Sequence, residues 1–260
     1  MVRPFHERRE VFNLWRAGHS GKGIARATGI PRSTLRYWLR HFAGVAQAAE
    51  AADLKSAQWG FESLHQHHHP IYAYLLGLYL GDGCITRMRR TYVLRIFLND
   101  GQPNVVTEAM RAISQLVPIR RVGLDRRGHC VIVRSYWGGW PTLLPQHGPG
   151  RKHRRTIALE PWQDVIVAAH PGQFVRGCIQ SDGCRHRRVV RGKNYPAYAF
   201  ANRSTDIRQL FVQACALLGI RHRQPSAFVI SVARRPDVAR LDVIMAQSWS
   251  DPAEDSPASR

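Results

Sequence analysis

Two absences limit what kind of protein this sequence can encode. The longest apolar run, residues 71–80, is too short to cross a bilayer, and the opening MVRPFHERRE lacks the apolar core of a signal peptide. The five cysteines form no C-x-x-C pair and are odd in number, which favours reduced thiols over a disulfide framework. We therefore expect a cytosolic protein with no membrane partner.

Acidic residues and lysine are also scarce. Asp and Glu number 18 against 38 Lys and Arg, which gives a formal net charge of +20. Only four of these basic residues are lysines, namely Lys22, Lys55, Lys152 and Lys193, so the position of each lysine is informative. A strongly basic chain predicts a polyanionic partner, and nucleic acid is the first expectation. The hydrophobic content of 44% is enough to build a core.

The most informative feature present is a repeat. Residues 72–83 read YAYLLGLYLGDG, and residues 174–183 read FVRGCIQSDG. Each stretch has an internal glycine, closes with Asp-Gly and is followed by Cys. The two aspartates, Asp82 and Asp182, are 100 residues apart along the chain. The chain is therefore built around a duplicated segment.

The spacing predicts that each copy forms a helix that packs closely against the other copy. Small residues one turn apart, such as Gly77 and Gly81, let two helix backbones approach each other. We expect Gly83 and Gly183 to end the helices in left-handed geometry. Two carboxylates would then meet at helix C-termini, where like charge and the helix dipole both oppose them. A divalent cation would remove this conflict.

The repeat resembles the motif of the LAGLIDADG homing endonucleases, in the single-chain form with two motifs. The positions kept are Leu75, Gly77 and Leu78 in the first copy and Phe174 and Gly177 in the second, each with the closing Asp-Gly. Both copies lack the motif's middle acidic residue, which is replaced by Leu80 and Gln180. In the family that residue is not the metal ligand, so its loss leaves the expected chemistry in place.

The resemblance implies an α+β fold with two pseudo-symmetric α-β-β-α-β-β-α halves in one chain, and a monomer with internal pseudo-twofold symmetry. It implies hydrolysis of phosphodiester bonds in double-stranded DNA at a long, specific site. The implied cofactor is Mg²⁺ or another divalent cation. Its ligands would be Asp82 and Asp182 with the backbone carbonyls of Gly81 and Ser181.

A lysine near the scissile phosphates is a further feature that the resemblance implies. Lys152, in the basic run 148–155, is the residue that matches it, and a solvated turn in a basic linker is the alternative interpretation. A lysine there stabilises developing negative charge or assists water activation. The second half offers only Arg234 and Arg235 at the corresponding place. An arginine can hold charge but cannot act as a base.

The hydrophobic pattern after each motif is also repeated. Residues 91–99, 129–135, 195–204 and 227–235 predict strands, and residues 104–117 and 205–219 predict helices. Asn99 and Asn202 follow their strands at matching places, which supports the duplication. The basic residues expected to face DNA on or between these strands are Arg87, Arg89, Arg90, Arg95, Arg185, Arg187, Arg188, Arg191 and Lys193. Solvated Arg-rich hairpins are the alternative.

Residues 7–42 predict three short helices with a Gly-containing turn before the third. Ser20 is the expected N-cap of the second helix, and Gly29 its end. The segment resembles homeodomain-like and resolvase-type helix-turn-helix domains, whose third helix enters the major groove. The residues expected to contact DNA are Arg32, Ser33, Thr34, Arg36, Tyr37 and Arg40. A plain three-helix bundle with a solvated basic face is the alternative.

These patterns divide the chain into five predicted parts. They are a helix-turn-helix domain (1–44), a linker (45–69), the first half (70–165), the second half (166–247) and a disordered polar tail (248–260). A zinc site formed by Cys178, Cys184 and His186 is a weaker alternative to reduced, buried thiols.

The function expected from the sequence is site-specific cleavage of duplex DNA. A DNA-binding regulator that keeps the fold without cleavage is the competing interpretation, supported by the degraded second motif and by the missing second lysine. An RNA-splicing maturase is a third interpretation, against which the helix-turn-helix argues. Retention of both Asp82 and Asp182 favours the endonuclease, because a pure binding module does not need them.

Overall fold

The computed structural model describes residues 11, 14–15, 17–36, 39, 64, 66–117 and 122–247, with only the backbone described at position 190. The chain forms two compact units, Met1–Trp59 and Gly60–Arg260. None of the described helices is long and apolar enough to cross a membrane.

The first unit contains helix α2 (Gly21–Thr28), which begins and ends as the sequence predicts. The Ser20 hydroxyl accepts a hydrogen bond from the Gly23 amide at 3.1 Å, and Gly29 ends the helix with a left-handed φ of 66°. Residues 32–36 are again helical. A small core packs Val11, Ile24, Ile30 and Leu35 together. Tyr37 and Arg40 lie outside the described residues.

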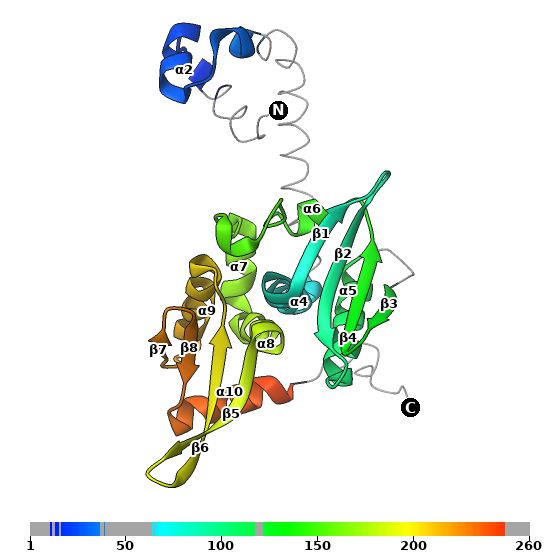
Figure 1. Cartoon of the computed structure of the whole chain (residues 1–260), viewed down its shortest axis with the longest axis vertical. Coiled ribbons are helices and arrows are strands. Elements are labelled where there is room, and N and C mark those ends of the chain that lie inside the picture. Colours follow the sequence, from blue (N-terminus) through cyan, green and yellow to red (C-terminus); the bar gives the residue numbers. More distant parts are fainter. Residues whose placement is uncertain are drawn as a thin grey trace, which may run out of the picture. The chain divides into compact units, whose positions relative to one another are not determined.

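The second unit has the α+β fold expected from the sequence, with two halves of similar element order (Figure 1). The first half contains η1 (Gln66–His68), α4 (His69–Asp82), β1 (Gly83–Arg87), β2 (Tyr92–Asn99), α5 (Pro103–Leu116), β3 (Val122–Arg127) and β4 (Cys130–Tyr136). The connecting segment contains α6 (Trp140–Leu143), η2 (Lys152–Arg154) and α7 (Pro161–Ala169). The second half contains α8 (Pro171–Asp182), β5 (Gly183–Val190), β6 (Lys193–Ala201), α9 (Thr205–Leu217), β7 (Arg223–Ser226), β8 (Val229–Val232) and α10 (Arg235–Ala246).

Each half contains one four-stranded antiparallel sheet, and the two sheets have the same topology. The strand orders are β1-β2-β4-β3 and β5-β6-β8-β7, so the strands that the sequence predicts, β2, β4, β6 and β8, are the central ones. Leu94, Ile96 and Leu98 alternate along one face of β2 and are buried in the common core. The two sheets lie on either side of the central helices α4 and α8 (Figure 1).

Helices α4 and α8 pack against each other through their glycines. A Cβ atom added to Gly77 would overlap the Phe174 carbonyl oxygen and lie 2.8 Å from the Cys178 nitrogen. A Cβ atom added to Gly177 would similarly lie 2.9 Å from the Leu78 nitrogen. Only hydrogen fits at either position, because the backbones themselves are in contact. The close helix approach predicted from the repeat is therefore present.

The glycine that follows each motif aspartate has a role different from the one predicted. Gly83 (φ −93°) and Gly183 (φ −116°) are extended, so the prediction of left-handed geometry is wrong. A Cβ atom at Gly83 would lie 2.6 Å from the Tyr79 Cα atom, and one at Gly183 would lie 2.7 Å from the Ile179 Cα atom. Glycine is required here because each helix turns directly into a strand that passes against its own last turn.

A buried polar network joins the two halves on one side of the α4–α8 pair. Arg176 of α8 forms a bidentate ion pair with Glu108 of α5, with Nη2 donating to Oε2 at 2.8 Å. Gln180 donates to the same carboxylate at 3.3 Å and accepts from the Tyr74 hydroxyl at 2.6 Å. A buried pair of this kind adds little net stability, but removing one partner leaves an uncompensated buried charge at a cost of about 3–5 kcal/mol. It therefore helps to fix how the second half docks on the first.

The glycine contact can be tested by adding one methyl group. Gly77→Ala is expected to lower the free energy of unfolding by about 1–3 kcal/mol, because the new Cβ atom forces the two helices apart. Urea unfolding followed by circular dichroism measures the change. Gly138→Ala is the matched control, since a Cβ atom there meets nothing within 4 Å. Equal unfolding midpoints for the two variants would contradict the proposed packing constraint.

Candidate active site

The helix packing brings the two motif aspartates to one place. Asp82 and Asp182 are the last residues of α4 and α8. A Cβ atom added to Gly81 would lie 3.0 Å from Asp182 Oδ2 and would overlap the Ser181 hydroxyl. The end of one helix thus touches the end of the other, and the four expected ligands, Gly81, Asp82, Ser181 and Asp182, form one group.

The two carboxylates are difficult to ionise together. Burial, followed by the nearby charge of Asp182, raises the pKa of Asp82 to about 7, and the Lys152 ammonium opposes this shift. Burial also raises the pKa of Asp182, against a hydrogen bond from Asn202 and the charge of Lys152. The site therefore has an excess of negative charge once both groups are ionised, and a divalent cation would offset it.

Asn202 holds Asp182 in place. Its Nδ2 donates to Asp182 Oδ2 at 2.6 Å, and its Oδ1 accepts from the Ser204 amide at 2.8 Å. Its backbone amide also bonds to the Phe228 carbonyl at 3.0 Å. The amide side chain is thus fixed at both ends, and it presents a donor to one carboxylate oxygen.

The prediction that Asn99 and Asn202 occupy matching places in the two halves is wrong by one residue. Gly83 pairs with Ile96 in the first sheet and Gly183 pairs with Phe200 in the second, which aligns Asn202 with Leu98. Asn99 makes the same local turn, accepting from the Gly101 amide at 2.8 Å. No described residue donates a hydrogen bond to the Asp82 carboxylate, so the two halves of the site are not equivalent.

Lys152 lies in the site and not in a solvated turn. Its Nζ donates to the Leu80 carbonyl at 3.0 Å, to the Gly81 carbonyl at 3.2 Å and to the Tyr79 carbonyl, and it lies 4.7 Å from the centre of the Tyr79 ring. It therefore caps the C-terminus of α4, where a cation is favoured by the helix dipole. Burial lowers the pKa of Lys152 to about 8, although the charges of Asp182 and Asp82 oppose the shift.

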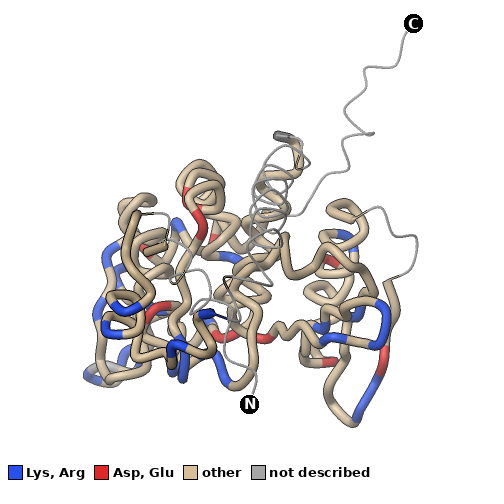
Figure 2. The backbone as a smooth tube through the Cα atoms, turned by 90° about the horizontal axis from the view of Figure 1, so that it is seen from above, with Lys and Arg blue, Asp and Glu red and all other residues tan. Residues whose placement is uncertain are grey.

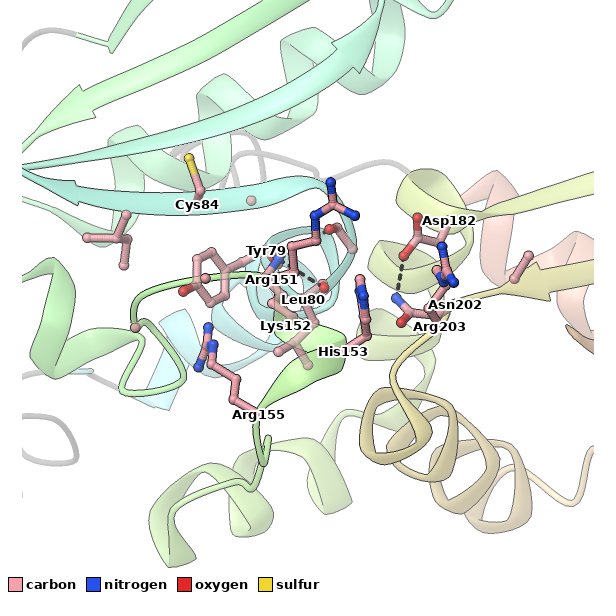
Figure 3. Close-up of a pocket in the computed structure, with 16 residues that line it drawn as sticks. Tyr79, Leu80, Cys84, Arg151, Lys152, His153, Arg155, Asp182, Asn202 and Arg203 are labelled. Atoms are coloured by element: carbon pink, nitrogen blue, oxygen red, sulfur yellow. Dashed lines mark hydrogen bonds between the residues drawn. The ribbon is translucent and has the colours of Figure 1, made fainter. Parts of the chain in front are cut away.

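A cleft of about 390 Å³ opens beside Asp182 and Lys152, and basic side chains line it (Figure 3). They come from the connecting segment and from the loop after β6, and they are Arg151, Lys152, His153, Arg155 and Arg203. The connecting segment is anchored to the second half, because the Ile157 amide donates to Asp206 at 2.8 Å. No sequence pattern predicts Arg203 or the role of Asn202, because both depend on where β6 ends.

The other predicted contact residues fall into two groups. Arg32, Ser33, Thr34 and Arg36 lie in the first unit, which is not placed relative to the carboxylates. Arg87, Arg89, Arg90, Arg187, Arg188, Arg191 and Lys193 are exposed, and Arg95 is half-buried. Arg185 is engaged within the protein, with Nε donating to Asp242 of α10 at 2.8 Å. Arg185 pairs with the buried Tyr198, so it lies on the side of the sheet that faces the helices and not on the opposite face.

The oxygen atoms of the site fit a hard divalent cation. Carboxylates and carbonyls are the ligands that Mg²⁺ accepts, and Mg²⁺ commonly keeps several waters or substrate phosphates alongside one or two carboxylates. Within the described residues, no three His, Cys, Asp or Glu side chains cluster as a metal site, so Cys178, Cys184 and His186 form no such cluster either. The protein would thus supply two carboxylates and two carbonyls.

The charge conflict at the site has a measurable effect on stability. The pKa of the Asp82 carboxyl is about 7 in the folded state against an ordinary 3.8. The stability that comes from the protonated carboxyl is therefore fully present below pH 4 and is lost as the pH rises through 7. Without divalent cations, Asp82→Asn is therefore expected to be more stable than the wild type by about 1–2 kcal/mol at pH 8, after allowance for partial solvation, and by little at pH 4. Urea unfolding at both pH values tests this. Asp164→Asn, at an exposed site, is the control, and a pH-independent difference for Asp82→Asn would contradict the expectation.

Comparisons with known proteins found one family model and several solved structures that are similar to parts of this chain. Residues 7–49 match the family model of a homeodomain-like domain, and no curated protein matches the chain in sequence. A solved structure of I-DmoI in complex with DNA and Mn is 12% identical, with a TM-score of 0.47 over 70% of this chain and 99% of that one. The LAGLIDADG meganuclease I-AabMI bound to uncleaved DNA is 11% identical, with a TM-score of 0.43 over 66% of this chain and 82% of that one. The N-terminal LAGLIDADG domain of WhiA is 12% identical, with a TM-score of 0.42 over 70% of this chain and 84% of that one. The chain is thus similar to homeodomain-like domains at its N-terminus and to LAGLIDADG proteins in its second unit.

Proposed function

We propose that this protein is a site-specific endonuclease that hydrolyses phosphodiester bonds in double-stranded DNA with the help of Mg²⁺. The observation that carries the proposal is the meeting of Asp82 and Asp182 at the ends of two glycine-packed helices, beside a buried lysine. A structural role does not require two partly buried carboxylates with raised pKa values side by side. A shared divalent cation would offset their charge, so a metal-dependent reaction accounts for their proximity.

Each residue of the site has a distinct task in this proposal. A bound divalent cation would lower the pKa of a water molecule and neutralise charge on the leaving oxygen. Asp82 and Asp182, with the carbonyls of Gly81 and Ser181, would hold the cation. Asn202 fixes the orientation of Asp182 through its Nδ2 donor. Lys152 would place positive charge next to the phosphate that is cut.

Duplex DNA fits the charge of the whole chain. Lys and Arg occur along both halves of the second unit, whereas Asp and Glu are fewer (Figure 2). Proposed contact residues on the two sheets are Arg87, Arg89, Arg95, Arg187, Arg188 and Lys193, and those on the first unit are Arg32, Ser33, Thr34 and Arg36. Tethering of the first unit would add affinity through a second binding surface. One aspartate from each half would let a single chain act on both strands.

A non-cleaving DNA-binding protein is the second candidate, and one contact favours it. The Lys152 ammonium lies 3.2 Å from the Gly81 carbonyl, which is one of the expected metal ligands, so an internal cation already occupies part of that site. Arg234 and Arg235, at the end of the second sheet, cannot replace a lysine base. Direct measurement of cleavage separates the two candidates.

Cleavage should depend on both aspartates. With Mg²⁺, the wild type is expected to cut a randomised duplex library at defined sites, and Asp82→Asn and Asp182→Asn should each abolish double-strand breaks, because each removes one ligand. Lys152→Met should slow cutting by about 10²–10³-fold. Sequencing of the ends measures all of these. Tight, salt-sensitive binding by the wild type with no Mg²⁺-dependent cutting would refute the endonuclease and favour the second candidate.

Asn202 offers a strand-specific test with a matched control. Asn202→Ala is expected to slow cutting of one strand by about 10–100-fold, because Asp182 loses the donor that orients it, so nicked DNA should accumulate. Asn99→Ala removes the same kind of local turn in the first half without touching either aspartate. It should leave the rates for the two strands in their wild-type ratio. Single-turnover cleavage of a strand-labelled duplex gives both rates, and equal slowing of both strands by Asn202→Ala would contradict this role.

A further inference from the structure

The face of each sheet that points away from the helices, called here the outer face, is chemically different in the two halves. Strand register identifies these faces, because alternate residues of a strand share a side. In the first sheet, Ile96 is buried against the helices, so its neighbours Arg95 and Phe97 lie on the outer face. In the second sheet, Phe200 is buried in the same way, so Ala199 and Ala201 lie on the outer face.

The outer face of the first sheet carries long side chains at its centre. Arg95 and Arg134 are direct cross-strand neighbours. Arg95 Nη1 donates to the Thr86 hydroxyl at 3.3 Å, and Arg134 forms an ion pair with Asp125 on the adjacent strand. Gly123 faces Arg134, and its missing side chain leaves room for the guanidinium. Each arginine thus has one Nη1 contact within the sheet, and among the described residues neither Nη2 has a hydrogen-bond partner.

Aromatic rings flank these arginines. Phe97 is 39% exposed and Tyr136 is 44% exposed, and both share the outer face with Arg95. Fixed guanidinium forks are suited to bidentate contacts with base edges in the major groove, and apolar side chains are suited to thymine methyl groups. This face therefore has the groups that direct reading of a base sequence requires.

The outer face of the second sheet has small residues at the matching positions. The pairing of Gly83 with Ile96 and of Gly183 with Phe200 aligns Arg95 with Ala199 and Phe97 with Ala201. Ser231 is the cross-strand neighbour of Ala199, so it stands in the place of Arg134. Alanine and serine are too short to reach base edges as an arginine does. Arg223 of the edge strand β7 is exposed and is the cross-strand neighbour of Ser231, so this face has an arginine at its edge but none on its two central strands. Other basic residues of this sheet lie near the β5–β6 turn, and they include Arg188, Arg191 and Lys193.

From this contrast we infer that the two halves divide the work of DNA binding. The first sheet reads base sequence through Arg95 and Arg134, and the second sheet holds the phosphate backbone through the basic β5–β6 hairpin. The inference rests on the proposed binding of duplex DNA, but it does not depend on cleavage. It assigns sequence specificity mainly to the half-site under the first sheet.

The inference is tested by selecting preferred sites from a randomised duplex library with the full chain and Ca²⁺ in place of Mg²⁺. Arg95→Ala and Arg134→Ala are expected to lose about 5- to 150-fold of discrimination at particular base pairs of one half-site. Arg188→Ala is the matched control on the second sheet. It should keep the base preferences and reduce the slope of log affinity against log salt by about one unit.

The outcomes separate this inference from the proposed function. Unchanged base preferences in both Arg95→Ala and Arg134→Ala would overturn the inference, as would relaxed preferences in Arg188→Ala. The wild type could bind selectively, lose that selectivity in Arg95→Ala and yet cut no DNA in Mg²⁺. That result would keep the inference and overturn the proposed endonuclease. No binding to any duplex would overturn both. Circular dichroism melting confirms that each variant is folded before its preferences are compared.

Discussion

The contact between Gly77 and Gly177 is the constraint on which the rest of the second unit depends. Because neither residue has a side chain, the backbones of α4 and α8 touch, and the helix ends must converge. Asp82 and Asp182 meet as a consequence of packing, and no bond between them is needed. The sheets, which follow directly from Gly83 and Gly183, are then placed on opposite sides of the helix pair (Figure 1).

The two halves share a fold but not their polar contacts. Arg176 and Gln180 of α8 bind Glu108, whereas the matching positions of α4 are Leu76 and Leu80. Lys152 caps α4, whereas the Ser181 hydroxyl donates to the Gly177 and Cys178 carbonyls within α8. A duplicated framework has thus acquired different polar partners on its two sides, and this gives each aspartate its own surroundings.

The sequence predicts the framework well and the site less completely. The motif helices follow from repeated apolar runs with small residues one turn apart, and α4 is buried on all sides between Ile71 and Leu80. Helices α5 and α9 and the central strands follow from apolar periodicity, because each buries a regular face. The four edge strands β1, β3, β5 and β7 were not placed, because their residues are polar or exposed and show little alternation. The motif identifies Asp82 and Asp182, and the lysine that the family resemblance implies identifies Lys152 in the basic run 148–155. The role of Asn202 was missed, because it depends on a one-residue difference in where the strand ends and not on a local pattern.

The composition of the edge strands has a consequence for how the protein behaves alone. An open edge exposes unpaired backbone groups, which invite another sheet to add to it. Here β5 carries Arg185, Arg187 and Arg188, and β7 contains Arg223 and Pro225. Like charges repel a second copy, and proline lacks the amide donor that a new strand would need. The arginines that suit a polyanion thus also protect the second sheet from aggregation through its edge strands.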